Sequence, residues 1–445
     1  MTAGERVAPA PTGWRRLTWL GPGFLWMVSA AGSGELLFTP RVGSLYGYAL
    51  LWALLLAVTF KWFINREIGR YAVCTGHNLL AGFAGLPGPR GWAVWLIVLP
   101  QLLVAVATLA GLAGATATAL VLGLPGDVRW WAVASVAVAT LLVVWGRYRA
   151  VERVATVMAL GLAIAAVAAA IAVGPDLGRF AAGLVPVPPE HVDLAEILPW
   201  LGFMLSGAAG MIWYSFWLPA KGYGAARSRT PLTGEDTLRL RGWLRQMTLD
   251  NTVAVVGTLI ITVAFLVLGT ELLRPRALVP QENETARVLG RLLGEVWGPV
   301  GFWFMVVAVF VGFWDTILSD QDGFGRMFVS GARLLRNPGA VSGGDGRDAD
   351  QDAVRERRMR RWIVLVVLAA APTALYLLVG EPVTLLKAAG AIEAAHIPVV
   401  AGLTLYLNHR QLPRHLRPTR FAAAGTGIAG LFFVGFTVFF LVEVL

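Results

Sequence analysis

Long apolar stretches, separated by short polar connections, follow one another along almost the whole chain. About eleven of them are long enough to cross roughly 30 Å of hydrocarbon. Their centres fall near residues 32, 60, 108, 138, 163, 209, 259, 310, 371, 395 and 432. Because backbone polar groups in lipid must be satisfied within the protein, this pattern predicts an all-α protein that spans a membrane many times.

Two of the predicted spans are interrupted near their middle. In the first span, the run Gly-Ser-Gly-Glu at 32–35 separates two apolar stretches, and in the sixth span Gly207 and Gly210 flank two alanines. Matched breaks in the two halves of a chain are typical of transporters built from inverted repeats, which bind their substrate at the midplane of the membrane. The alternative is that these glycines only allow neighbouring helices to pack closely. The carboxylate of Glu35 favours the first interpretation, because acids within a span are costly and usually functional.

The arginines predict the orientation of the chain. Connections rich in arginine alternate with connections that are poor in Arg and Lys or balanced by acids, so we expect the N-terminus in the cytoplasm and the C-terminus outside a bacterial-type cytoplasmic membrane. The expected parts are a cytoplasmic segment over 1–16, a first inverted repeat over 17–175, an external linker over 176–194, a second repeat over 195–408 with a mobile cytoplasmic loop at 337–361, and a loop with an eleventh span over 409–445.

The composition agrees with a membrane protein and excludes several other classes. Hydrophobic residues make up 57% of the chain and charged residues 14%, and the mean hydropathy is +0.66. The net charge of +10 is explained by cytoplasmic connections, so a nucleic-acid partner is unnecessary. The single cysteine, Cys74, excludes an internal disulfide framework and a cysteine-rich metal cage. No nucleotide-binding or catalytic motif is present, so we expect neither an enzyme nor a cofactor.

The residues around the first break resemble a known family. The run Gly-Pro-Gly-Phe-Leu at 21–25 and the run Gly-Ser-Leu-Tyr-Gly-Tyr-Ala-Leu-Leu-Trp at 43–52 are similar to the first span of Nramp divalent-metal transporters. Weaker similarities occur at Gly207, Ala208, Met211, Gly312, Thr316, Ile317, Gly323, Ile397 and Pro398. The resemblance implies a leucine-transporter-type fold of five plus five helices in inverted repeats, with helices 1 and 6 broken at the midplane, and transport by alternating access.

The chain departs from the family at both breaks. The family's first break reads Asp-Pro-Gly-Asn, which is Gly32 to Glu35 here, and its second reads Met-Pro-His, which is Met211 to Trp213 here. The metal-binding Asp is therefore replaced by Gly32, and Met211 alone remains of the second motif. The third predicted span, about 94–122, lacks the acids that proton-coupled Nramp proteins carry there, so Nramp-type proton coupling is not expected to carry over. Glu35, Asp315, Glu393 or His396 could accept protons instead.

Other residues could compensate for the missing carboxylate, because hard cations need oxygen ligands and neutralising charge. Glu35 lies one turn from the missing Asp, and Asp315 lies in the eighth span. Nearby Asp320 and Asp322 are expected to pair with Arg326 instead. The predicted substrate-binding residues are Gly32, Ser33, Gly34, Glu35, Ala208, Met211, Trp213 and Asp315, and the candidate metal ligands are Glu35, Met211 and Asp315.

Three hypotheses for the function remain open. The chain is a permease for a hard divalent cation such as Mg²⁺ or Mn²⁺, bound by these side chains and by backbone carbonyls at both breaks. Alternatively it carries a small organic substrate, an amine or amino acid, since Gly-Ser-Gly at 32–34 is also similar to the start of amino acid, polyamine and organocation permeases. A ring such as Trp213 would help to bind an amine. Third, it is a sensor or scaffold without transport. In each case we expect a monomer in the lipid bilayer.

Overall fold

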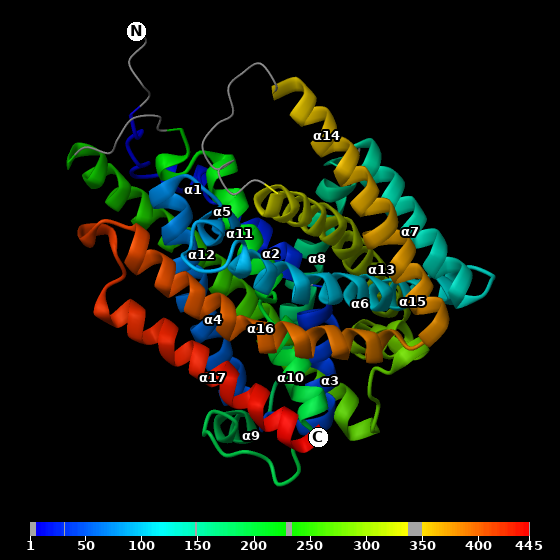
Figure 1. Ribbon diagram of the computed structural model, residues 1–445. Helices are drawn as coiled ribbons and strands as arrows, with labels where there is room; N and C mark the ends of the chain where they lie inside the picture. The colour runs from blue at the N-terminus through cyan, green and yellow to red at the C-terminus, as the bar shows by residue number, and fades with distance from the viewer. Residues whose placement is uncertain (1–5, 31, 147–148, 228–233, 337–348, 445) are drawn as a thin grey trace.

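The computed structural model describes residues 6–30, 32–146, 149–227, 234–336 and 349–444, and within these ranges all regular structure is helical (Figure 1). The helices are α1 (Arg15–Thr18), α2 (Pro22–Ala30), α3 (Thr39–Tyr46), α4 (Leu51–Thr75), α5 (Leu79–Ala84), α6 (Trp92–Gly123), α7 (Val128–Trp145), α8 (Arg149–Val173), α9 (Leu177–Ala182), α10 (Leu194–Phe203), α11 (Ala208–Lys221), α12 (Gly234–Leu268), α13 (Thr285–Arg336), α14 (Ala349–Trp362), α15 (Ala371–Val379), α16 (Pro382–Gln411) and α17 (Arg420–Val444). Short π-helical segments join α2 to α3 and α14 to α15.

The number of spans agrees with the sequence pattern. In the described ranges, nine helical segments are long and apolar enough to cross a membrane. Two further spans fail that test for clear reasons, because the first is divided into α2 and α3, and α4 carries buried charged residues such as Lys61 and Glu67. With these two, the described part of the chain contains eleven candidate spans, the number that the apolar stretches predict.

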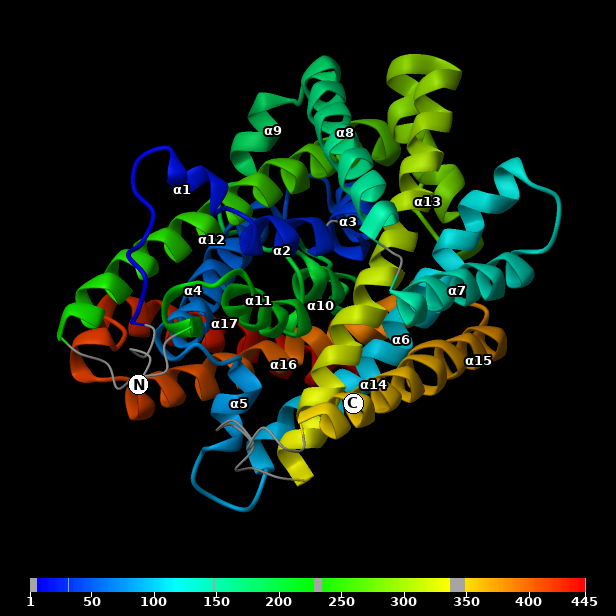
Figure 2. The ribbon, with the colours of Figure 1, turned by 90° about the horizontal axis from the view of Figure 1, so that it is seen from above.

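The divided segment α10–α11 forms the centre of the molecule. Within this segment, 94% of an apolar stretch of 18 residues is buried inside the protein. In the segment Arg420–Glu443 the buried share of such a stretch is 17%. Figure 2 shows α10 and α11 in the middle, with α2 and α3 on one side and α16 on the other, in agreement with the contacts between these helices. The two interrupted spans are therefore neighbours in the core, whereas the last span lies at the periphery.

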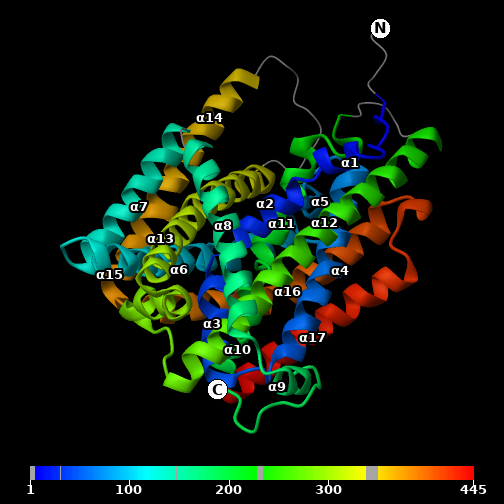
Figure 3. The ribbon, with the colours of Figure 1, turned by 180° about the vertical axis from the view of Figure 1, so that it is seen from behind.

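The two ends of the molecule carry different peripheral elements. In Figures 1 and 3, α1 and α14 lie at one end and α9 lies at the opposite end. Helix α14 covers 349–362, a region where the sequence favoured a mobile loop over 337–361. Glutamate, glutamine and arginine residues of this region favour a helix. The side chain of Glu356 also pairs with Arg333 at 2.9 Å. Residues 337–348 of that predicted loop lie outside the described residues.

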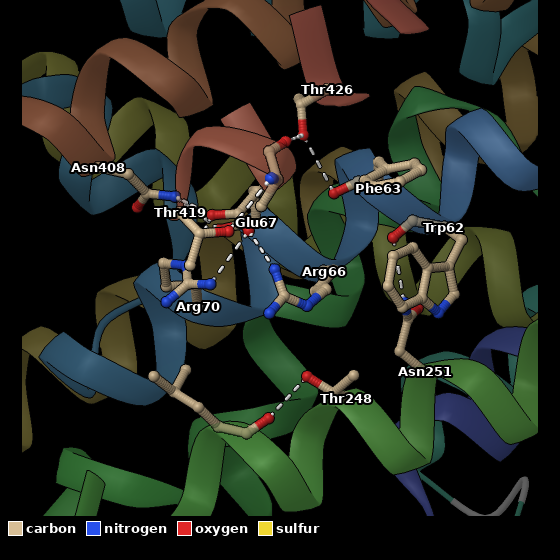
Figure 4. A network of polar contacts seen from close by, with 12 residues as sticks. Trp62, Phe63, Arg66, Glu67, Arg70, Thr248, Asn251, Asn408, Thr419 and Thr426 are labelled. Carbon is tan, nitrogen blue, oxygen red and sulfur yellow. Dashed lines mark hydrogen bonds and ion pairs between the residues drawn. The ribbon is translucent and has the colours of Figure 1, made fainter. Parts of the chain in front are cut away.

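Helix α4 is anchored by a buried polar cluster, which Figure 4 shows. The Glu67 carboxylate is fully buried and accepts hydrogen bonds from Arg66 and from Arg70, each at 2.7 Å. Asn408 of α16 donates to the Glu67 carbonyl at 2.9 Å, and Asn251 of α12 donates to the carbonyl of Trp62 at 3.1 Å. A buried charge needs such partners, and these fix α4 against α12 and α16.

Candidate substrate site between two broken helices

The first break lies between α2 and α3. Gly32 has φ −78° and ψ −109°, which is not helical, and the chain then makes a wide π-helical turn over Ser33–Phe38 before α3 begins. Gly34 contacts the other broken helix so closely that a Cβ atom built on it would lie 2.8 Å from the carbonyl oxygen of Phe203. Glycine is therefore required at this position by the approach of another backbone.

The second break lies at 204–207, between α10 and α11. Leu205 and Ser206 have φ angles of 54° and 68°, a left-handed conformation that costs a residue with a side chain about 1 kcal/mol or more. Helix α11 begins at Ala208, so Gly210 is helical. The unwound part therefore comes earlier in the chain than the glycines at 207 and 210 predict. Its position is fixed by side chains from three other segments, which bind its backbone groups.

One of these side chains belongs to the first break. The Glu35 carboxylate is fully buried, and its Oε1 accepts a hydrogen bond from the backbone N–H of Leu205 at 2.7 Å. A buried N–H without a partner would cost about 1–3 kcal/mol, so this contact stabilises the unwound conformation. The two breaks meet, as the paired glycine pattern predicts.

The carbonyl groups of the second break are bound by Lys61 of α4. Its Nζ atom donates to the carbonyl oxygens of Gly202 at 2.8 Å, Met204 at 2.5 Å and Ser206 at 2.8 Å. Lys61 has no exposed surface. The sequence predicts that backbone carbonyls at the breaks bind a passenger ion, but these three carbonyl oxygens already bind an amino group of the protein itself.

The third side chain is Glu393 of α16, which caps the first turn of α11. Its carboxylate accepts from the backbone N–H of Ala208 at 2.7 Å and of Ala209 at 3.4 Å. Negative charge is favourable at a helix N-terminus, where four N–H groups lack helical partners. Gln101 of α6 donates to Glu393 at 3.1 Å and also lies 2.9 Å from Nδ1 of His396. Glu393 thus joins α6, α11 and α16 beside the break.

A small cavity of about 40 Å³ lies where the two breaks meet. A cavity of about 10–15 Å³ measured in this way can already hold one water molecule, so this cavity has room for more than one. Its walls carry two carboxyl groups, four hydroxyl groups, three aromatic rings and small or apolar groups, from Asp320, Glu393, Ser33, Thr108, Ser206, Thr316, Phe203, Trp213, Phe324, Val104, Gly207, Ala209 and Gly210. The indole N–H of Trp213 and the hydroxyl of Thr108 are buried there without a hydrogen-bond partner in the described structure.

The predicted substrate residues lie in different positions around this cavity. Ser33 and Trp213 line it. Gly32 packs against Thr316, because a Cβ atom on it would lie 2.4 Å from the Thr316 hydroxyl oxygen. Gly34, Glu35 and Ala208 connect the breaks to each other and to Glu393 through the contacts described above. Met211 is buried within α11.

Asp315 is separated from the other candidate ligands. It borders a different cavity, of about 30 Å³, with residues of α8 and α12 such as Leu162 and Phe265. Glu35 instead directs its carboxylate to Leu205. Helix periodicity explains the difference, since Thr316 and Asp320 share one face of α13 and Asp315 points away from it. Across the described part of the chain, no group of three or more His, Cys, Asp or Glu side chains is arranged to hold a metal ion.

The remaining acids of α13 have opposite roles. Asp322 binds Arg326 at 2.8 Å, as the sequence predicted, and it also binds Arg360 of α14. Asp320 was expected to do the same but borders the cavity, and only 6% of its surface is exposed. Two residues along a helix differ by about 200° in direction, which sends these carboxylates to opposite sides.

Sequence reasoning missed Lys61 and Gln101. A signal for Lys61 was present, because a lysine in the middle of the apolar second span is costly unless it is bound inside the protein. Gln101 gave a similar but weaker signal in the third span. Neither residue indicates its binding partner from the sequence, because the distances between spans are determined by the fold.

Two broken helices that meet in the core of an eleven-span bundle define a membrane transporter of the leucine-transporter fold. Solved structures agree with this class. A mutant form of a manganese transporter of Eremococcus coleocola matches with a TM-score of 0.70 at 16% identity, over 97% of this chain and 88% of that one. The structure of Mhp1, a nucleobase-cation-symport-1 family transporter, matches with a TM-score of 0.54 at 14% identity, over 97% and 95% of the two chains.

The chain belongs to the Nramp family, whose model, described as natural resistance-associated macrophage protein-like, matches residues 23–443. Among relatives, an uncharacterized protein of Pasteurella multocida is 26% identical over 339 residues, which are 71% of each chain. The divalent metal cation transporter MntH of Brucella suis is 27% identical over 316 residues, which are 69% of this chain and 66% of the relative. The resemblance seen at the first break thus extends over the whole transporter.

Proposed function

We propose that the protein moves a cation across the cytoplasmic membrane by alternating access, with a hard divalent metal ion, Mg²⁺ or Mn²⁺, as the passenger. The observation that carries this proposal is the cavity at the meeting point of the breaks, which Asp320 and Glu393 border with carboxyl groups. The names of family relatives support it, because they include divalent metal cation transporters. The arginine-rich connections favour an N-terminus in the cytoplasm.

The donor set suits a hard ion that keeps part of its water. Carboxylate oxygens supply charge, and the hydroxyl groups of Ser33, Ser206 and Thr316 can hold the hydration shell. Mg²⁺ dehydrates reluctantly and is usually bound through one or two carboxylates and several waters. The predicted ligands Glu35 and Met211 are not among the residues that line this cavity.

Proton coupling through the third span is not part of this proposal. The cavity-lining positions of α6 are Val104 and Thr108, which cannot exchange a proton near neutral pH. We therefore propose a facilitative permease, or coupling through a route that does not use α6.

Transport assays in proteoliposomes test the proposal. Vesicles that contain a metal-sensitive dye and the purified protein are given Mg²⁺, Mn²⁺, Co²⁺ and Ca²⁺ in turn, and protein-free vesicles are the control. Entry of Mg²⁺ or Mn²⁺ that is independent of a pH gradient is the expected result. If none of these ions enters, the metal proposal is wrong.

An organic amine is the second candidate. The rings of Trp213 and Phe324 meet edge to face with 4.9 Å between their centroids beside the two carboxyl groups, and such rings can attract an ammonium group. In the same vesicles, entry of a labelled small amine without entry of any metal would select this function.

A further inference from the structure

The end of α10 and the unwound segment after it gather three carbonyl oxygens around one ammonium group. We propose that the carbonyl oxygens of Gly202, Met204 and Ser206 form a site for a monovalent cation, and that the ammonium group of Lys61 is its permanent occupant. This inference goes beyond the proposed transport of a divalent ion and does not depend on it.

The geometry requires a charged occupant. Nζ of Lys61 lies 2.8, 2.5 and 2.8 Å from the three carbonyl oxygens. An ammonium group has three N–H donors and can satisfy all three oxygens, whereas a neutral amine has only two. Two left-handed residues, Leu205 and Ser206, lie in the segment that brings the Ser206 oxygen to the same point as the other two. The strained backbone and the bound charge therefore belong together.

The chemistry of the oxygens selects a singly charged ion. All three come from neutral carbonyl groups, whereas divalent ions are held in proteins mainly by carboxylates. The carboxylates of Glu35 and Glu393 interact with Lys61 electrostatically, but their closest bonds go to backbone N–H groups of Leu205 and Ala208. An alkali ion or an alkylammonium ion matches this environment in charge.

The ammonium group of Lys61 is covalently attached to α4, so it is not itself transported. A cation that is attached to α4 cannot leave, and α4 is fixed by the buried cluster around Glu67. In this proposal the positive charge at the unwound segment belongs to the protein itself. It follows that the wild-type protein needs no free sodium or potassium ion at this position.

Replacement of the lysine tests the site. Lys61→Met removes the charge and keeps a flexible side chain, so we expect the empty oxygens to bind a free ion. The melting temperature of the purified variant is measured in sodium, potassium and N-methyl-D-glucamine chloride at equal ionic strength. We expect Na⁺ or K⁺ to raise it by about 2 °C or more over N-methyl-D-glucamine, and the wild type to show no such difference. Equal melting temperatures for the variant in the three salts would overturn the proposal.

A second variant tests the site independently if Lys61→Met does not fold. In Lys61→Ala the missing side chain leaves room for propylammonium, which we expect to raise the melting temperature where the neutral propanol does not. Lys221→Met is the matched control, because Lys221 binds one carbonyl oxygen, that of Leu20 at 2.9 Å, and forms no cage. If neither Lys61 variant is stabilised by any of these cations, or neither folds in their presence, the site does not accept a free ion and the proposal is wrong.

Discussion

The two breaks accommodate a non-helical backbone inside the protein in opposite ways. At the first break, Gly32 and Gly34 allow neighbouring groups to approach the bare backbone, and Leu36 N–H still bonds to the Gly32 carbonyl at 3.1 Å. At the second break, the backbone on and around the left-handed residues 205 and 206 is bound by charged side chains from three other segments. Glu35 accepts from Leu205 N–H, Lys61 donates to the carbonyl oxygens of Met204 and Ser206, and Glu393 accepts from Ala208 N–H. The first break therefore depends on the absence of side chains, and the second depends on their presence.

Close backbone packing therefore determines the first break, whereas charged side chains determine the second. The first break brings its own acid, Glu35, and uses it on the second break. At the second break, Lys61 binds the carbonyl oxygens of Gly202, Met204 and Ser206, and two carboxylates bind the N–H groups of Leu205 and Ala208. In the function we propose, the cargo is therefore recognised by side chains at the cavity, and mutations should affect the two breaks differently.

The largest effect is expected at Gly34. In Gly34→Leu the new side chain meets the backbone of Phe203 and Met204, which cannot move away without separating the end of α10 from the π-helical segment Ser33–Phe38. We expect uptake in proteoliposomes to be abolished and the variant to be less stable by about 1–3 kcal/mol or more. Gly402→Ala is the control, since nothing lies within 4 Å of its Cβ position. Normal uptake by Gly34→Leu would show that the breaks do not need to touch.

The next effect concerns charge at the cavity. Asp320→Asn removes a carboxylate from the wall, and we expect cation uptake to fall by about tenfold at low cation concentration. Asp322→Asn, two residues further along α13, removes only the ion pairs with Arg326 and Arg360 and is the matched control. Equal uptake by the two variants would contradict the position of the cargo site.

A smaller effect is expected on stability at Glu35. Glu35→Ala leaves the buried N–H of Leu205 without its acceptor, which should cost about 1–3 kcal/mol in the free energy of unfolding. Glu35→Gln retains a carbonyl oxygen and should cost less. Thermal unfolding in detergent compares the two variants. If both unfold like the wild type, the hydrogen bond between the breaks does not hold them together.

The smallest effect on stability is expected at Asp322, whose ion pairs on α13 are partly exposed, in contrast to the buried Asp320 on the same helix. Asp322→Asn loses partly exposed ion pairs, each worth less than about 1 kcal/mol. We expect its melting temperature to stay within about 2 °C of the wild type. A larger drop would mean that α14 is held to α13 mainly through Asp322.

The architecture could be predicted from the sequence because it follows from local pattern. Apolar length marks the spans, and the glycines at 32 and 34 mark the first break correctly. The second break was placed too late along the chain, because its conformation is stabilised by distant side chains rather than by its own glycines. Lys61 and Asp320 are the clearest cases, since a single sequence does not contain the distances that bring them to the centre.

The central claim is that the two breaks meet at the passage of the cation, and Ser33 on the wall of the cavity gives the most direct test. Because Cys74 is the single cysteine, Cys74→Ala supplies a cysteine-free background in which Ser33→Cys can be labelled alone. Uptake of Mn²⁺ is measured before and after treatment with a small, positively charged thiol reagent. We predict that the reagent blocks uptake in Ser33→Cys but not in the background, and that Mn²⁺ slows the labelling. Full uptake after complete labelling would contradict the account.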